Sequence, residues 1–280
     1  MRISKILVPT DFSKCAINAL KVATEIAIKQ GAKLEIVNAF HVPSYAPMDV
    51  MAVDLVNQPL LKEEEQKVKE EFKTLPNSIP QLKDVNYSTK VFMAPTADAI
   101  YQCTEQDDID LIVMGTKGEH DVVENLFGSM SAQVIKSAEV PVLVIPENVD
   151  GFELKHIGFA ADLHEIENMN RLSILSLLAK MYGAEINIFH ISQESDEESI
   201  SEAARERMFL EGSLKDIKHT FATIYHEEPL EGIMEFAEDK KLDMLAMYPR
   251  QHGFWDKLIH GSTTKKVVMQ IKIPLLTIHE

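Results

Sequence analysis

Two copies of one pattern of strands and helices fill the chain. The segment KILVPTDFSKCAINALKVATEIAIKQGAKLEIVNAFHV, residues 5–42, can be laid over HIGFAADLHEIENMNRLSILSLLAKMYGAEINIFHI, residues 156–191. In each copy an apolar run ends at an aspartate, Asp11 or Asp162, and a helical stretch and a second apolar run follow. A duplication of this size predicts two domains of the same fold.

Strands alternate with helices within each copy, and this order indicates the fold class. The strands are apolar without alternation, as expected of parallel strands that are buried on both faces. Strands joined by helices of this length form right-handed crossovers. We therefore predict an α/β fold of two tandem doubly wound domains, each with a five-stranded, mostly parallel sheet flanked by helices. The turn-forming sequence PENVDG separates the copies, which places the domains at residues 1–147 and 152–280.

The first copy shows the expected elements most clearly. We expect strands at Lys5–Val8, Lys33–Asn38, Tyr87–Phe92, Asp110–Met114 and Val140–Ile145, and helices at Ser13–Gln30, Thr96–Asp107 and Ser129–Ser137. The first helix carries one apolar face, made of Ala16, Leu20, Ala23 and Ala27, and Gly31 should end it. An insertion between the second and third strands combines an apolar, methionine-rich part, Ser44–Pro59, with a charged helix, Lys62–Thr74.

Charge and cysteine content restrict the kind of protein. The chain has 28 basic and 44 acidic residues and a net charge of −16, which argues against binding nucleic acid through bulk electrostatics. Any bound phosphate therefore needs a local pocket of backbone N–H groups. The two cysteines form no spaced framework and indicate free, buried thiols in a reducing compartment. No stretch resembles a signal peptide or a membrane span, so we expect a soluble, cytoplasmic protein without membrane contact.

A glycine-rich loop follows the fourth strand of the first copy. Gly115, Gly118 and the pair Gly128–Ser129 form the pattern G-x2-G-x9-G-S. Ligands of doubly wound sheets bind beyond the carboxyl ends of the strands, and glycine lets a backbone approach a phosphate closely. The helix that begins at Ser129 offers N–H groups and a dipole that favour an anion, and Ser131 adds a second hydroxyl. The spacing matches neither a Walker loop nor the G-x-G-x-x-G dinucleotide motif.

This loop, the opening ILVPTDFS and the closing strand VPVLVIP together resemble the universal stress protein family, and the two copies resemble its tandem members. The resemblance implies that the first domain binds ATP or another adenine nucleotide. In that arrangement Asp11 bonds the ribose, the backbone of Pro9 and Thr10 lies near the adenine, and Ala39 and Met114 line the base pocket. The glycines and Ser129 hold the phosphates. The complete set that the resemblance implies is Pro9, Thr10, Asp11, Ala39, Met114, Gly115, Lys117, Gly118, Gly128, Ser129, Met130 and Ser131.

Acidic residues in the loop bear on the form of the nucleotide. Glu119, His120 and Asp121 follow the second glycine, where family loops are often basic, and Lys117 supplies one cation. Two carboxylates beside a triphosphate lower its affinity unless a divalent cation neutralises them. We therefore hypothesise that binding needs Mg²⁺, or that AMP or ADP binds in preference to ATP.

The second copy lacks two of the loop glycines. Tyr248 and Gln251 stand where the first copy has Gly115 and Gly118, and Pro249 stiffens the loop. Because side chains at both positions close the phosphate cradle, we expect a degenerate site without nucleotide and a structural role. Trp255 and Phe254 in this loop are expected to be packing groups.

The last strands of the two copies are expected to pair. Domains of the universal stress protein family associate through their last strands, so PVLVIP and PLLTIH would form an internal pseudo-dimer within one chain. Mutual pairing also covers two apolar sheet edges that would otherwise invite partners. Whether two chains then form a homodimer stays open.

Several functions stay open at this point. The leading interpretation is a stress-response regulatory protein, in which nucleotide in the first copy biases a surface for an unidentified protein partner. The alternatives are a nucleotide-free scaffold or chaperone-like protein, a slow ATPase, and a binder of small hydrophobic molecules. No H-E-x-x-H spacing and no G-x-S-x-G elbow occurs, so at most weak ATP hydrolysis is expected. A metal site at His156, Asp162 and His164 is a minor alternative, and the methionine-rich part is either a contact surface or a lid.

Overall fold

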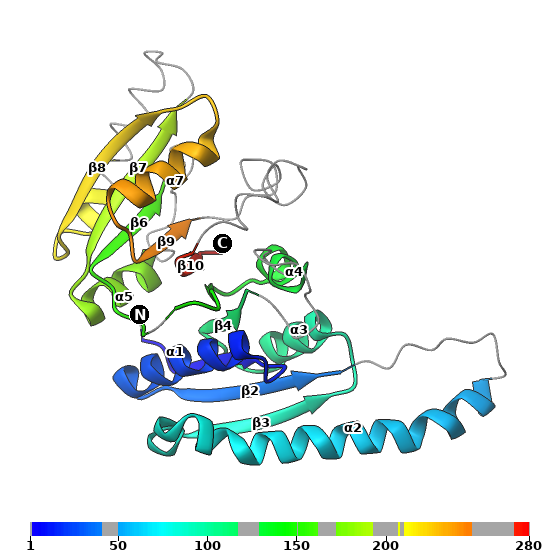
Figure 1. Ribbon diagram of the computed structural model, residues 1–280. Coiled ribbons are helices and arrows are strands. Elements are labelled where there is room, and N and C mark those ends of the chain that lie inside the picture. Colours follow the sequence, from blue (N-terminus) through cyan, green and yellow to red (C-terminus); the bar gives the residue numbers. More distant parts are fainter. Residues whose placement is uncertain are drawn as a thin grey trace.

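Ten strands form one continuous sheet in the part of the chain that the computed structural model describes, residues 2–40, 50–116, 129–149, 151–161, 172–192, 207, 210–247 and 272–279. Their order is β3-β2-β1-β4-β5-β10-β9-β6-β7-β8 (Figure 1). The strands are β1 (Lys5–Pro9), β2 (Lys33–Ala39), β3 (Tyr87–Phe92), β4 (Leu111–Gly115), β5 (Val142–Ile145), β6 (His156–Ala160), β7 (Glu185–Ser192), β8 (His219–Tyr225), β9 (Met244–Met247) and β10 (Leu275–Thr277). The helices are α1 (Lys14–Gln30), α2 (Val50–Ser78), the 3-10 helix η1 (Pro80–Asp84), α3 (Thr96–Gln106), α4 (Ser129–Ser137), α5 (Ser173–Tyr182) and α7 (Pro229–Asp239).

Each half of the sheet repeats the same topology. In the first half β1 pairs with β2 and β4, β2 with β3, and β4 with β5, and every one of these pairs is parallel. The second half matches it strand for strand, with β6 in the position of β1 and β10 in the position of β5. The predicted fold of two tandem, doubly wound α/β domains with five-stranded parallel sheets is confirmed. Strands β2 and β3 follow on one side of β1, and β4 and β5 lie on its other side, so the strand order reverses between β1 and β4. Folds of this kind bind ligands at that position.

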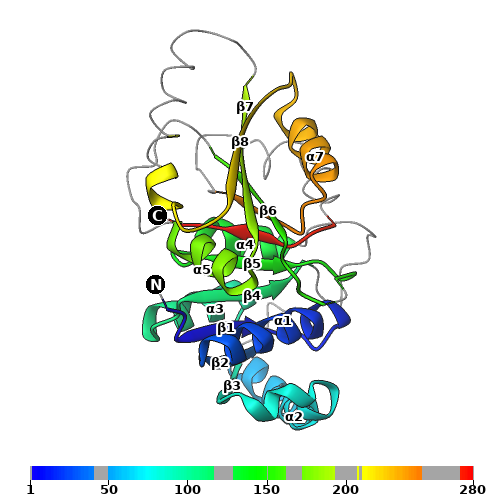
Figure 2. The ribbon, with the colours of Figure 1, turned by 90° about the vertical axis from the view of Figure 1, so that its left-hand side faces the viewer.

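The two halves join through their last strands. β10 runs antiparallel to β5, with Leu276 opposite Leu143 and Thr277 opposite Val142, and Figure 2 shows the two strands side by side. The hydroxyl of Thr277 also donates to the Val142 carbonyl over 3.3 Å. The predicted pairing of the last strands is therefore observed, and the edges of both half-sheets are covered at this seam.

Helix α1 shows why its sequence folds as expected. Ser13 is the N-cap, and its hydroxyl accepts a hydrogen bond from the backbone N–H of Ala16 over 3.3 Å. Gly31 ends the helix in the left-handed region, at φ 64°, which glycine adopts without a steric cost. The predicted apolar face, Ala16, Leu20, Ala23 and Ala27, is buried against the sheet.

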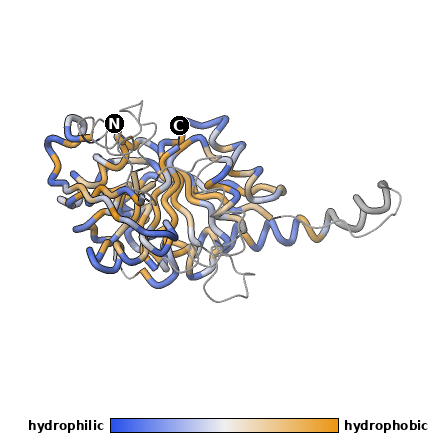
Figure 3. The backbone as a smooth tube through the Cα atoms, turned by 90° about the horizontal axis from the view of Figure 1, so that it is seen from above, coloured by the Kyte–Doolittle hydropathy of each residue, from blue (hydrophilic) through white to orange (hydrophobic). Residues whose placement is uncertain are grey.

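Helix α2 is longer than the sequence predicted. It begins at Val50 instead of Lys62, and both Pro59 and Pro76 lie inside it. The buried side chains Val68, Phe72 and Leu75 pack into the core, and this tertiary contact outweighs the low helix propensity of proline near the end of the helix. The amino-terminal part of α2 runs out beyond the sheet (Figure 1), whereas apolar residues gather at the centre of the molecule (Figure 3). None of the described helices is both long and apolar enough to cross a membrane.

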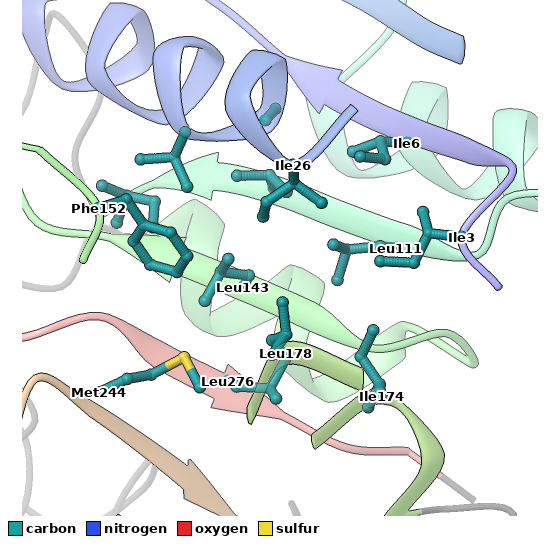
Figure 4. Close-up of a cluster of buried hydrophobic side chains, with 14 of the residues drawn as sticks. Ile3, Ile6, Ile26, Leu111, Leu143, Phe152, Ile174, Leu178, Met244 and Leu276 are labelled. Carbon is teal, nitrogen blue, oxygen red and sulfur yellow. The ribbon is translucent and has the colours of Figure 1, made fainter. Parts of the chain in front are cut away.

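One hydrophobic core spans both halves on one face of the sheet. Side chains from the first half, such as Ile26 and Leu143, and from the second half, such as Leu178 and Leu276, belong to one buried cluster (Figure 4). The opposite face has two separate clusters, one under α3 and α4 and one under α7. The two copies therefore share part of their core instead of touching only at the β5–β10 seam.

Polar contacts between α1 and α5 tie the same two halves together. The hydroxyl of Tyr182 donates to Glu25 Oε1 over 2.9 Å, and the amide of Gln30 lies 3.4 Å from Met181 Sδ. The ring of Phe152 packs edge-on against Tyr182 with centroids 5.4 Å apart. These contacts fix the helices of the two copies against each other beside the shared core.

Candidate functional site

The turn after β1 is held in place by its neighbour β2. The backbone N–H of Thr10 donates to the Val37 carbonyl over 2.8 Å, and the side-chain amide of Asn38 donates to the Thr10 carbonyl over 2.9 Å. Thr10 and Asn38 are buried, as is Pro9, the last residue of β1. Asn38 was not among the residues predicted from the sequence. A polar residue at the carboxyl end of the apolar run IV in the predicted strand was the signal that could have identified it.

Side chains within the turn bond its own backbone. The N–H of Phe12 donates to Thr10 Oγ1 and the N–H of Ser13 donates to Asp11 Oδ1, each over 3.0 Å. Phe12 takes the left-handed conformation at φ 63°, which is uncommon for a residue with a side chain. Asp11, the predicted ribose ligand, is half-buried at the start of this turn. One of its carboxylate oxygens thus shapes the backbone that leads into α1.

Gly115 has a packing reason that the sequence did not reveal. A Cβ at this position would lie 2.8 Å from Cys15 Sγ and 3.2 Å from the backbone nitrogen of Ala16. The first turn of α1 can therefore approach the end of β4 only because residue 115 is glycine. Cys15 itself is buried, as predicted for both cysteines, and its thiol lies 3.5 Å from the Ile145 carbonyl.

Helix α4 is tied to the end of β4. The buried hydroxyl of Ser131 donates to the Thr116 carbonyl over 3.1 Å, and the N–H of Thr116 donates to the Ile145 carbonyl over 3.1 Å. The single hydroxyl proton of Ser131 is thereby used inside the protein. Its observed role is to hold together residues 116 and 131, which flank the glycine loop.

The predicted base-pocket residues lie at the ends of neighbouring strands. Ala39 is the half-buried last residue of β2 and stands opposite Phe92 of β3. Met114, near the end of β4, is buried in the cluster under α3 and α4, against which Met130 also packs. The carboxyl ends of β1, β2 and β4 thus bring Thr10, Ala39 and Met114 to one edge of the sheet.

Part of the predicted site falls outside the described residues. This part comprises Lys117, Gly118, Glu119, His120, Asp121 and Gly128 in the first copy, the side chain of Ser129 at the start of α4, and Asp162, His164, Tyr248, Pro249, Gln251, Phe254 and Trp255 in the second copy. The predictions made for them stay predictions. Among the residues that are described, no group of three or more potential metal ligands occurs.

The second copy has a contact that corresponds to the one between Asn38 and the Thr10 carbonyl. His190 occupies the position in β7 that Asn38 occupies in β2, and its Nδ1 lies 3.2 Å from the Ala161 carbonyl. Ala161 corresponds to Thr10. In both copies a side chain of the neighbouring strand therefore contacts the carbonyl of the residue before the predicted aspartate, although the side chain is an asparagine in one copy and a histidine in the other.

A separate charged cluster joins β1, β2, β3 and the end of α3 in the first copy. Lys5 and Lys90 each pair with both Glu35 and Asp107, at distances of 2.7 to 2.9 Å. Hydrogen bonds from Lys5 and Lys90 lower the pKa of Asp107 to about 2. Burial and the nearby Glu35 raise the pKa of the Cys103 thiol to about 12, so that this thiol is protonated at neutral pH. The cluster is a structural ion-pair network.

Comparison with known proteins identifies the family. The model of the Universal stress protein family matches residues 2–146 and 153–279. A universal stress protein of Methanocaldococcus jannaschii is 31% identical over 141 residues, which cover 50% of this chain and 81% of that protein. A second universal stress protein of the same organism is 29% identical over 151 residues, which cover 50% of this chain and 93% of that protein. The crystal structure of a universal stress protein from Archaeoglobus fulgidus has the same fold, with a TM-score of 0.72 and 18% identity over 100% of this chain and 97% of that one. The chain therefore belongs to the universal stress protein family, with two tandem domains of that family.

Proposed function

We propose that the first copy binds an adenine nucleotide at the carboxyl edge of β1, β2 and β4. The observation that carries the proposal is the close packing of Gly115 on the first turn of α1, next to the turn that holds Asp11. This packing sets the start of the glycine loop beside the turn that carries Asp11, between β1 and β4, where the strand order reverses. The resemblance to nucleotide-binding members of the family supports the same location.

The nucleotide would be held by groups from three strand ends and the glycine loop. We assign the ribose to Asp11, the adenine to the backbone of Pro9 and Thr10 with Ala39 and Met114 beside it, and the phosphates to the loop. The loop residues in this assignment are Gly115, Lys117, Gly118, Gly128, Ser129, Met130 and Ser131. In this assignment Gly115 lets the first turn of α1 pack against the end of β4, and the hydroxyl of Ser131 bonds the Thr116 carbonyl at the start of the loop.

Magnesium is part of the proposal. Glu119 and Asp121 add negative charge to the loop, and a bound Mg²⁺ would neutralise the charge that a triphosphate brings there. Affinity for ATP should therefore depend on Mg²⁺, whereas affinity for AMP should change little. Equal affinities for ATP, ADP and AMP with and without Mg²⁺ would exclude this role of the metal.

The second copy is proposed to serve as a structural partner without nucleotide. It supplies β10 to the seam and half of the shared core, and these contacts do not depend on a ligand. We further propose that nucleotide in the first copy biases a surface that a partner protein recognises, in the cytoplasm, as part of a stress response. A phosphate-release assay distinguishes this binding protein from a slow ATPase.

Release of bound nucleotide tests the proposal. The purified protein is denatured and any released nucleotide is identified by chromatography, alongside the variants Gly118→Val and Gln251→Val, which change corresponding positions of the two copies. We expect about one adenine nucleotide per chain from the natural protein and from Gln251→Val, and none from Gly118→Val. A protein that releases no nucleotide and is not stabilised by added ATP with Mg²⁺ would refute the proposal, because a ligand at 100 times its Kd stabilises by about 2.7 kcal/mol.

A further inference from the structure

Phe12 is a strained residue in the middle of the proposed site. Its φ of 63° is a conformation that residues with a Cβ rarely adopt, and such residues persist only where their surroundings enforce them. Its neighbours are Asp11, the proposed ribose ligand, and Ser13, which caps α1. The conformation of Phe12 therefore sets the direction in which the Asp11 carboxylate and the first turn of α1 face.

Two contacts enforce this conformation. The backbone N–H of Phe12 donates to Thr10 Oγ1 over 3.0 Å, within the turn itself. The ring of Phe12 packs edge-on against the ring of Phe72, with centroids 5.2 Å apart and planes at 72°. Edge-to-face pairs of this geometry attract beyond the area that they bury. Phe72 belongs to α2, so a helix outside the β1–α1 unit contributes directly to the shape of the turn.

Only one face of the described part of α2 packs into the core, and Phe72 lies on that face. Val68, Phe72 and Leu75 are buried in the shared core, and Phe72 is 6% exposed. The remaining surface of this part of the helix carries solvent-exposed ion pairs such as Lys73 with Glu70. The amino-terminal part of α2 runs out beyond the sheet (Figure 1). Docking of α2 onto the sheet and the contact with Phe12 therefore depend on the same few side chains.

We propose that Phe72 is a positioning residue, through which docking of α2 sets the conformation of the Asp11 turn and hence the nucleotide affinity of the first copy. This inference rests on the proposed function of that copy. Because coupling between two sites is reciprocal, bound nucleotide must in turn strengthen the docking of α2. Helix α2 is then the element that reports whether the site is occupied.

Three variants test the coupling. Phe72→Leu keeps an apolar side chain in the core but removes the ring, and Leu178→Val removes a similar amount of buried surface from the same core, on helix α5 of the second copy. Phe12→Gly allows the positive φ without strain but also lacks the ring. We expect Phe72→Leu and Phe12→Gly each to weaken ATP binding about fivefold, as the loss of one aromatic pair predicts. Leu178→Val should bind as the natural protein does at a comparable loss of stability against urea.

A double-mutant cycle and hydrogen exchange separate positioning from general destabilisation. If the two rings act through one contact, the variant with both Phe12→Gly and Phe72→Leu binds no more weakly than either single variant. Nucleotide should slow amide exchange in residues 68–75 of the natural protein and leave it unchanged in Phe72→Leu. A natural protein that binds no nucleotide refutes the proposed function itself. Nucleotide binding that is unaffected by Phe72→Leu, or losses that add in the double variant, overturns the positioning role alone.

Discussion

Replacing Gly115 with alanine should destabilise the protein, because the first turn of α1 occupies the space that a Cβ needs. An ideal Cβ would lie 2.8 Å from Cys15 Sγ, 3.1 Å from the Cys15 carbonyl carbon and 3.2 Å from the Ala16 nitrogen. Favourable contacts between carbon atoms are about 3.5–4.0 Å long. The thiol can rotate away, but the two backbone atoms move only if α1 lifts from β4.

The magnitude follows from two opposing effects. Overpacking of a core costs about 1–3 kcal/mol, and the loss of glycine's freedom in the unfolded chain offsets about 0.4–1 kcal/mol. The net loss should be about 1–2 kcal/mol, which corresponds to a fall in Tm of about 2–3 °C for a chain of this size. Adding Cys15→Ala removes the shortest contact and leaves the two backbone contacts, so it should recover only part of the loss.

Thermal and urea unfolding measure this prediction against a matched control. Gly212 lies in a helical turn, and an added Cβ there meets no atom within 4 Å. Gly212→Ala should therefore raise the free energy of unfolding, because alanine favours helix over glycine by about 1 kcal/mol. A Gly115→Ala protein as stable as the natural one, or a complete rescue by Cys15→Ala, would show that α1 does not press against β4 as described.

Three further predictions concern stability. Lys5 and Lys90 lower the pKa of Asp107 from 3.8 to about 2. The stability that the Asp107 carboxylate contributes is therefore complete above the pKa of the unfolded chain and is lost as pH falls through the pKa of the folded protein. Asp107→Asn should cost about 1–2 kcal/mol in urea unfolding at about pH 7 and almost nothing near pH 2. Leu276→Ala should cost about 2–5 kcal/mol and still unfold in one transition, since Leu276 lies in the core shared by both copies, whereas two calorimetric transitions would contradict a shared core. Tyr182→Phe should cost about 1 kcal/mol by removing the hydrogen bond to Glu25, and an unchanged midpoint of urea unfolding would show that this bond does not stabilise the protein.

The sequence predicted most of the fold because its signals are local. The apolar face of α1, the serine before it and Gly31 after it gave the helix within one residue at its start. The helix α4 and the strand β3 were predicted at their observed bounds. The length of α2 was underestimated, since prolines in a sequence usually mark helix ends and the tertiary packing of Phe72 is not visible from neighbouring residues. The shared core could not be predicted for the same reason: side chains such as Ile26 and Leu178 meet only after the two half-sheets have joined.

The site was harder to predict than the fold, because residue type does not reveal which neighbour a residue faces. Gly115 was interpreted as a glycine that lets a phosphate approach, and the structure shows that it also lets α1 approach. Ser131 was expected to offer a hydroxyl to a ligand, and its hydroxyl bonds the Thr116 carbonyl. Asn38 lay outside the motifs and Phe12 lay in ILVPTDFS without an assigned role, yet they contact the turn at Asp11 through a hydrogen bond and a ring contact. Such supporting residues become visible only when strands distant in sequence lie next to each other.

The unequal loops of the two copies are compatible with their joint fold. An unpaired edge at β5 would invite association with other chains, and β10 covers that edge from within the same molecule. Cover of this kind needs the strands and core of the second copy. The paired residues at the seam, 142–144 and 275–277, lie outside the loop in which Tyr248 and Gln251 stand in place of glycines. The first copy, by contrast, needs Gly115 both to seat α1 on β4 and to form the proposed site, so packing and ligand binding restrict this position together.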